Sequence, residues 1–201
     1  MPEIRIIAGE WRGRRITVPS AGMRPTSDRV REAWMSIVRP SLDGARVVDL
    51  CAGTGALGLE ALSRGAAQCE FVEQDPAVRR TLEANIKALG AESRSTVHRG
   101  EALAFLSDAV TTAVTTAETA ASSGEGGGTR WDVAFADPPY KLGVAEALAA
   151  RWLATGFATI FGVEHEAALT LPVPTDGRAA DRRVYGDSAG TIYRLPTTKR
   201  T

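Results

Sequence analysis

A run of glycines in this chain has the spacing found where a polypeptide wraps a nucleotide-type cofactor. Gly53, Gly55 and Gly58 follow the apolar segment 47–50. Glycine permits positive φ angles and a close approach of ligand to backbone, and a helix that begins there offers unpaired N–H groups. The spacing is also typical of an ordinary strand-to-helix turn. It therefore predicts a cofactor turn, formed by Ala52, Gly53 and Gly55, only if other residues support it.

Two carboxylates indicate which cofactor this turn binds. Asp49 lies near the end of the apolar strand, where a buried carboxylate is costly without a partner. Glu73 ends the next apolar run, about 20 residues after the glycines, where an adenosine ribose is held; the alternative is a solvated charge. A pyrophosphate offers Asp49 no partner, whereas a sulfonium or an ammonium group does. Together, Asp49, the glycines and Glu73 favour S-adenosylmethionine over NAD as the cofactor.

The segment 137–140, Asp-Pro-Pro-Tyr, predicts an acceptor site. Proline fixes φ and has no N–H, so Asp137 and the carbonyl of Pro138 form a pair that only accepts hydrogen bonds. Such a pair suits an amino group whose lone pair is delocalised into a ring, and Tyr140 offers a face for that ring. We predict an in-line methyl transfer to nitrogen that relies mainly on positioning, with Asp137, Pro138 and Tyr140 as catalytic residues. The alternative is a stiff loop.

Cysteine and histidine chemistry is not indicated. A cytosine-C5 mechanism needs a nucleophilic cysteine, and neither Cys51 nor Cys69 adjoins the Pro-Pro turn. His98 and His165 are isolated in the sequence. We expect no metal site.

The elements that position these residues alternate between strand and helix, which predicts an open, mostly parallel α/β sheet. The expected strands are 47–50, 68–73, 95–98, 131–136 and 158–164, with helices at 57–62, 75–89 and 143–153 and a closing antiparallel hairpin of 182–185 and 191–195. If strand 131–136 lies beside strand 47–50, Asp137 and the glycine turn share one edge. Glu101, after the third strand, then either contacts the cofactor or starts a helix.

The N-terminal 44 residues are expected to form a small extension of a β-hairpin and a helix. Residues 1–46 contain nine arginines and five acidic residues, a local net charge of +4, although the whole chain is neutral. Strands 5–8 and 15–18 would flank Trp11, with Arg12, Arg14 and Arg15 nearby. Trp11 is interpreted as a stacking platform beside cations that bind phosphates; the alternative is that Trp11 covers the core face of the hairpin.

A helix over 27–38 is predicted by an apolar stripe, with Thr26 or Ser27 as N-cap and with Arg29 and Arg31 off the stripe. The main domain would span 45–196, with a flexible insertion at 108–129 and a disordered tail at 197–201. The 201 residues predict one domain without a membrane span or signal peptide, and so a cytoplasmic protein.

With these motifs in place, the chain resembles the RsmD-type methyltransferases. The resemblance covers most of the chain apart from 108–129, and it depends on the segments 5–9, 13–15, 24–32, 49–66, 137–140, 163–165 and 184–187. It implies a Rossmann-like class I methyltransferase with a seven-stranded sheet and a closing antiparallel hairpin. It also implies that S-adenosylmethionine is held by the glycine turn, Glu73 and Glu101, and that the segment from Thr26 to Arg29 closes over it. Two departures are the long insertion and Cys51, where an aromatic residue is common.

The activity that the resemblance implies is methylation of the exocyclic N2 of one guanine in 16S rRNA, with the N-terminal extension helping to bind the RNA. For the RNA contacts we expect Arg12, Arg14, Arg15 and Arg29. The modest basic surface favours an assembling small ribosomal subunit over naked RNA, and we expect a monomer. Four alternatives stay open: methylation of DNA adenine N6, methylation of protein glutamine, an NAD-dependent dehydrogenase, and a non-catalytic RNA-binding module.

Overall fold

The centre of the protein is a mixed sheet of seven strands in the order β5-β4-β3-β6-β7-β9-β8. The computed structural model describes residues 2–19, 28–108, 131–140 and 142–196. Five neighbouring strands are parallel, and the last two complete the sheet as an antiparallel hairpin. The strands are β3 (Arg46–Asp49), β4 (Gln68–Glu73), β5 (Ser95–Arg99), β6 (Trp131–Ala136), β7 (Ala158–Glu166), β8 (Ala179–Tyr185) and β9 (Ser188–Arg194). The predicted α/β class and the closing hairpin are confirmed.

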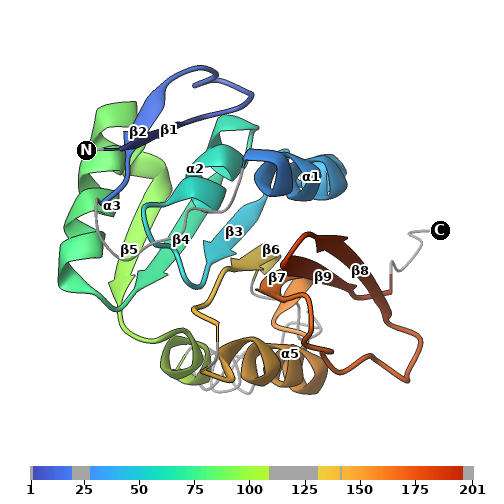
Figure 1. Ribbon diagram of the computed structural model, residues 1–201. Helices are drawn as coiled ribbons and strands as arrows, with labels where there is room; N and C mark the ends of the chain where they lie inside the picture. Colours follow the sequence, from blue (N-terminus) through green and yellow to red (C-terminus); the bar gives the residue numbers. More distant parts are fainter. Residues whose placement is uncertain (1, 20–27, 109–130, 141, 197–201) are drawn as a thin grey trace, which may run out of the picture.

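Helices cover both faces of this sheet, which is why its central strands are apolar on both sides (Figure 1). Val47 belongs to the core under α1 (Asp28–Val38), α2 (Ala56–Ser63) and α3 (Pro76–Leu89). Its neighbour Val48 belongs to the opposite core, under the helical residues 102–108 and α5 (Val144–Thr155). Two single turns, η1 (Arg39–Ser41) and η2 (Glu92–Arg94), complete the described helices.

Helix α3 begins and ends where its sequence predicts. The Asp75 carboxylate accepts hydrogen bonds from the N–H groups of Ala77 (2.7 Å) and Val78 (3.0 Å), and Pro76 occupies the first helical position. Gly90 adopts a φ of 70° and ends the helix. The helix therefore starts directly after the carboxyl end of β4.

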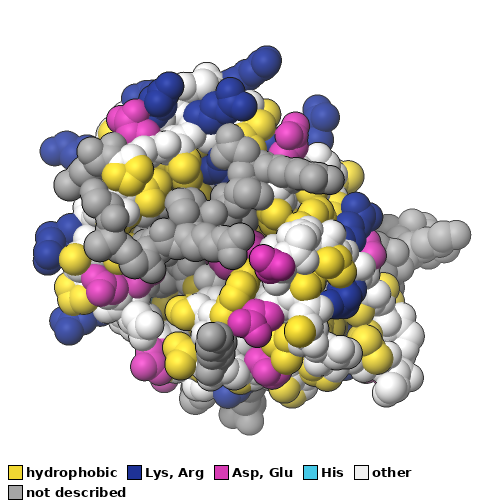
Figure 2. Space-filling view, in the orientation of Figure 1, with side chains coloured by type: hydrophobic (Ala, Val, Ile, Leu, Met, Phe, Trp, Pro, Cys, Tyr) yellow, Lys and Arg dark blue, Asp and Glu magenta, His cyan; other side chains and the backbone are white. Residues whose placement is uncertain are grey.

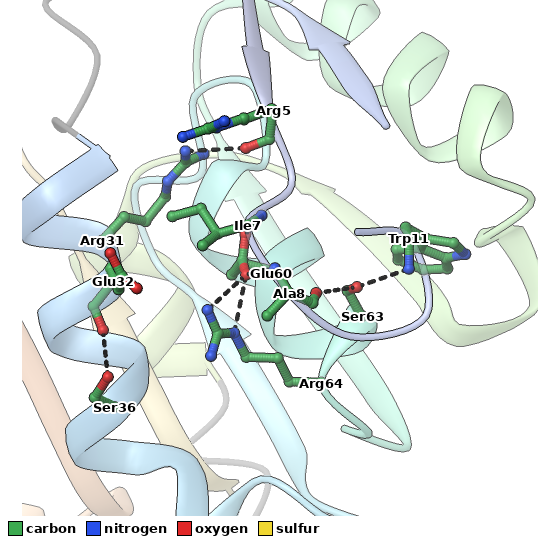
Figure 3. Close-up of polar contacts among 10 residues, drawn as sticks. All are labelled: Arg5, Ile7, Ala8, Trp11, Arg31, Glu32, Ser36, Glu60, Ser63 and Arg64. Atoms are coloured by element: carbon green, nitrogen blue, oxygen red, sulfur yellow. Dashed lines mark hydrogen bonds and ion pairs between the residues drawn. The ribbon is translucent and has the colours of Figure 1, made fainter. Parts of the chain in front are cut away.

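The N-terminal hairpin is shorter than predicted and is bound tightly to α2. Its strands are only β1 (Glu3–Arg5) and β2 (Arg15–Thr17). The connecting loop lies against α2, where the buried Glu60 carboxylate accepts hydrogen bonds from the N–H groups of Ile7 (2.8 Å) and Ala8 (3.0 Å) (Figure 3). Arg64 completes the contact, its Nη2 lying 2.8 Å from Glu60. Hydrogen bonds to α2 thus replace, at Ile7 and Ala8, the strand pairing that we expected there.

Helix α1 is buried on more sides than its stripe predicts. Trp34 stacks on Phe135 at 6.2 Å, and it lies so close to β9 that a Cβ at Gly190 would be 2.5 Å from its Nε1. The expectation that Arg31 lies off the buried stripe is wrong. Arg31 is fully buried and donates a hydrogen bond to the carbonyl of Arg5 (3.0 Å), because the N-terminal segment covers a second side of α1 (Figure 3).

The buried apolar side chains described within the first 44 residues share one core with those of the α/β unit, and the division at residue 44 stays a prediction. The turn of the closing hairpin is shorter than predicted, because β9 already begins at Ser188. The N-cap of α1, most of the insertion at 108–129 and the tail 197–201 lie outside the described residues. Within the described ranges, none of the helices combines the length and the apolar character needed to cross a bilayer.

Candidate active site

A cavity of about 700 Å³ lies at the carboxyl ends of the central parallel strands. Its volume is in the range of sites for cofactors and small ligands, and its place is the point where β4 and β6 flank β3 from opposite sides. The sequence-predicted residues that line it are Asp49, Ala52, Gly53, Glu73, Glu101, Asp137, Pro138 and Tyr140. The glycine turn and the Asp-Pro-Pro-Tyr segment therefore open onto one cavity.

The glycine turn is held in place by hydrogen bonds to β4. The Gly53 N–H donates to Glu73 Oε2 (2.9 Å), and the Ala52 N–H donates to the carbonyl of Val72 (3.0 Å). Glu73 Oε1 also accepts from the Asp75 N–H (2.8 Å), so this carboxylate joins the cofactor turn to the start of α3. Glu73 is half-buried and lines the cavity.

Gly55 is needed for packing. It adopts a φ of 86°, and a Cβ there would lie 2.6 Å from Leu82 Cδ1 of α3. Gly55 is not among the lining residues, although its neighbours Thr54 and Ala56 are. Its small size lets the turn lie close to α3, while Ala52 and Gly53 face the cavity.

Asp49 combines deep burial with an incomplete set of hydrogen bonds. Its Oδ2 accepts from the Gly58 N–H (3.0 Å), whereas Oδ1 makes no hydrogen bond within 3.5 Å to the described residues. Burial, helped by the charges of Asp137 and Glu73 and partly offset by nearby N–H groups, raises the pKa of Asp49 to about 7. An anion that is costly to bury and faces a cavity fits a cationic ligand group.

The acceptor segment also lines the cavity, together with a carboxylate that we had not predicted as a site residue. The Tyr140 hydroxyl donates to Oε1 of Glu164 (3.3 Å), and both residues line the cavity. Burial, with the charges of Glu164 and Asp137, raises the pKa of Tyr140 to about 12. Glu164 was visible in the sequence only as part of the segment 163–165, and the pairing of β7 with β6 brings it here.

Three apolar residues of the N-terminal extension, Ile4, Val18 and Val30, also line the cavity, and we had not predicted them as site residues. Buried Asn85 of α3 connects the extension to the cofactor turn. Its side-chain amide donates to the carbonyls of Thr17 and Thr54, at 3.0 Å each, and its Oδ1 accepts from the Thr17 N–H (2.9 Å). The extension is thus part of the site.

The predicted RNA contacts are only partly described. Arg12, Arg14 and Arg15 are exposed at the hairpin end of the molecule, where Figure 2 shows Lys and Arg side chains. Arg14 donates to the carbonyl of Ala88, and Arg15 lies 3.4 Å from Glu3. The side chain of Arg29 and the whole of Thr26 lie outside the described residues.

The interpretation of Trp11 as a stacking platform for RNA is wrong. Only 4% of the side chain is exposed, and the Arg94 guanidinium covers its ring at 4.9 Å. The Trp11 N–H donates to Ser63 Oγ (3.0 Å). Gly9 lets the loop lie this close, since a Cβ there would be 1.8 Å from the Ser63 carbonyl oxygen. Trp11 therefore covers the core, which was the alternative.

The environments of the two thiols and of His165 do not favour a second chemistry. Burial raises the pKa of both Cys51 and Cys69, so neither provides a thiolate near neutral pH. Burial lowers the pKa of His165, whose Nε2 lies 2.9 Å from Thr191 Oγ1. Among the described residues, no group of His, Cys, Asp and Glu side chains is arranged to hold a metal ion.

Comparisons with known proteins agree with this geometry. Residues 4–194 match the family described as conserved hypothetical protein 95. Ribosomal RNA small subunit methyltransferase D of Escherichia coli K12 is 36% identical over 198 residues, which covers 95% of this chain and 89% of the relative. The solved structure of a putative methyltransferase, yhhF, from Escherichia coli is 34% identical, with a TM-score of 0.76 and coverage of 96% and 97%.

A more distant solved structure supports the fold alone. An RNA methyltransferase from Salinibacter ruber, in complex with S-adenosyl-L-homocysteine, is 14% identical, with a TM-score of 0.58. The match covers 87% of this chain and 95% of that one.

Proposed function

The chain belongs to the family of conserved hypothetical protein 95, that of the RsmD-type methyltransferases, and we propose that it methylates the exocyclic N2 of one guanine in small-subunit ribosomal RNA. The fold is that of a class I methyltransferase, and the cofactor is S-adenosylmethionine. The observation that carries the proposal is the single cavity shared by Asp49, Glu73 and the acceptor segment 137–140. The names of the relatives support the substrate class.

The residues of the cavity fit this cofactor. The incompletely bonded Asp49 Oδ1 is suited to a cationic group, and Glu73 and Glu101 offer acceptors for ribose hydroxyls or adenine. Ala52 and Gly53 let the ligand approach the backbone. When bound, S-adenosylmethionine supplies an electrophilic methyl group. Thr26, which lies outside the described residues, is proposed to close over it.

The acceptor segment positions the nucleophile. The Asp137 carboxylate and the carbonyl of Pro138 accept hydrogen bonds from the amino group, which localises the nitrogen lone pair, and the Tyr140 ring stacks on the base. The consecutive prolines Pro138 and Pro139 restrict the backbone at these acceptors, so little ordering remains to be done when the base arrives. Nitrogen becomes acidic only as it acquires the methyl group, so a strong base is not required.

The substrate is proposed to be an assembling small ribosomal subunit in the cytoplasm, bound by a monomer through Arg12, Arg14, Arg15 and Arg29. A guanine inside folded RNA must be exposed or flipped out of its stack. The exposed arginines at the hairpin end support phosphate contacts. Equal rates on protein-free rRNA and on small-subunit particles would contradict the particle as the substrate.

Mass mapping of methylated nucleosides in rRNA from cells with and without this protein tests the function. We expect one N2-methylguanosine to disappear from small-subunit rRNA and to return with the wild-type chain, but not with Asp137→Ala. Asp137→Ala should still bind S-adenosylhomocysteine in calorimetry, because the residues proposed to hold the cofactor, Asp49, Glu73 and the glycine turn, are unchanged. An unchanged methylation map would refute the proposal.

The alternatives share the cofactor or the glycine turn. Transfer of radiolabelled methyl to rRNA, to DNA or to protein separates the guanine-N2 activity from methylation of adenine N6 or of glutamine. A non-catalytic RNA-binding module would transfer no methyl to any of them. The dehydrogenase alternative is not supported by the family, and calorimetry with NAD against S-adenosylhomocysteine tests it directly.

A further inference from the structure

Glu164 is a buried carboxylate beside the acceptor segment, and the methyl transfer described above does not use it. Only 6% of Glu164 is exposed, and it lines the same cavity as Asp137. In the sheet, Ala136 of β6 is paired with Val163 of β7. Asp137 and Glu164 directly follow these paired residues, so the two carboxylates are neighbours near the carboxyl ends of β6 and β7.

The hydroxyl of Tyr140 connects Glu164 to the proposed place of the base. This hydroxyl donates to Glu164 Oε1 (3.3 Å), and Ser188 of the closing hairpin lines the cavity next to them. Each carboxylate oxygen can accept more than one hydrogen bond, so the contact with Tyr140 leaves Glu164 able to accept from a ligand. A base stacked on the Tyr140 ring would meet acceptors from both Asp137 and Glu164.

Two neighbouring acceptors discriminate among bases by what stands next to the exocyclic amine. In guanine the amine at C2 has a hydrogen-bond donor beside it, the N1–H. In adenine and cytosine the ring nitrogen beside the amine carries a lone pair, and in a glutamine side chain the neighbour is a carbonyl oxygen. A carboxylate at that place pairs with guanine and repels the other three.

We propose that Glu164 accepts the N1–H of the target base and so restricts the reaction to guanine. The proposal rests on the proposed function and deepens it, because it names the residue that selects the base. Asp137 and the Pro138 carbonyl then hold the amine, while Glu164 reads the adjacent edge position. A site built to hydrogen-bond a substrate N–H rejects an analogue that lacks it far more strongly than an apolar pocket rejects a change of size.

The test uses 2-aminopurine, which keeps the amine of guanine but has a lone pair at N1. The guanine located by the mapping experiment is replaced by 2-aminopurine in ligated 16S rRNA, and the rRNA is assembled into small-subunit particles. For the wild-type chain we expect kcat/KM on guanine to exceed that on 2-aminopurine by about 10⁴-fold. Comparable rates on the two bases would overturn the proposal without any variant.

The variant Glu164→Gln separates base reading from a structural role, because its amide can donate to the N1 lone pair of 2-aminopurine. We expect guanine methylation to fall, 2-aminopurine methylation to rise above the wild-type rate, and the ratio to shrink to within about tenfold. Loss of both rates by the same factor would overturn the proposal. The matched control is Glu92→Gln in η2, an exposed carboxylate that does not line the cavity, which should keep the wild-type ratio.

Two further measurements distinguish a failure of the proposed role of Glu164 from a failure of the proposed function. Glu164→Gln should bind S-adenosylhomocysteine with wild-type affinity in calorimetry, because Glu164 is not among the residues proposed to hold the cofactor. If the wild-type chain methylates no guanine in the unsubstituted particles, it is the proposed function that fails. If it methylates guanine and 2-aminopurine alike, only the role of Glu164 fails.

Discussion

Replacing Glu60 by glutamine should loosen the N-terminal hairpin from α2. The fully buried Glu60 carboxylate accepts from the N–H groups of Ile7 (2.8 Å) and Ala8 (3.0 Å) and from Arg64 Nε (2.9 Å). Glutamine keeps one acceptor oxygen but places an NH₂ group against a donor. Removing one partner of a buried ion pair costs about 3–5 kcal/mol, and we expect the lower end because one oxygen remains.

The loss is large compared with the whole stability of such a protein, which is about 5–15 kcal/mol. A loss of about 3 kcal/mol should lower Tm by about 6–12 °C for a chain of this size. Arg64→Met should cost a similar amount, about 3–5 kcal/mol, because it leaves the buried Glu60 carboxylate without its cation. The double variant should show a coupling energy of about 1 kcal/mol or more.

Urea unfolding gives these free energies, and hydrogen exchange gives the local test. The amides of Ile7 and Ala8 should lose protection from exchange in Glu60→Gln. The amides of β3 should stay protected to the extent that the lowered free energy of global unfolding allows. If the free energy of unfolding changes by less than about 1 kcal/mol and both amides stay protected, the carboxylate does not anchor the hairpin and the reasoning is refuted.

Three further variants test the cofactor side of the site and the docking of the loop. Because a cation binds the ionised form of Asp49, whose pKa is raised to about 7, affinity for S-adenosylhomocysteine should fall below that pH by up to about tenfold per unit. Calorimetry should show no such fall in Asp49→Asn. Asn85→Ala removes a hydrogen-bond donor from the carbonyl of Thr54, and it should lower the free energy of unfolding by about 2 kcal/mol and weaken cofactor binding. Urea unfolding measures the first effect and calorimetry the second. Wild-type values in both measurements would contradict this prediction. Gly9→Ala should lower Tm several times more than Gly13→Ala. The two glycines have similar φ angles, but a Cβ at Gly9 would lie 1.8 Å from the last carbonyl of α2, whereas the space around Gly13 is open. Equal shifts of Tm in thermal unfolding would show that the close contact is unimportant.

The local signals of the sequence determined the core of the site. An apolar strand, a glycine turn and a helix start are neighbours along the chain, so the conformation around Gly53 and the place of Asp49 follow from residues a few positions apart. Parallel strands end at one edge of a sheet, and this rule alone brought Glu73, Glu101 and Asp137 to one cavity. These predictions require only that β3 lies between β4 and β6 in the sheet.

Only the tertiary structure decided which surfaces cover one another. Trp11 and Arg31 look like surface residues in the sequence, and both are buried because the N-terminal loop lies against α1 and α2. Glu60 looks like one more helical charge until Ile7 and Ala8 are placed beside it. Glu164 reaches the cavity through the pairing of β7 with β6, between residues far apart in the chain. Burial and charge pairing depend on such long-range contacts, and the periodicity of one segment carries no information about the segment that will pack on it.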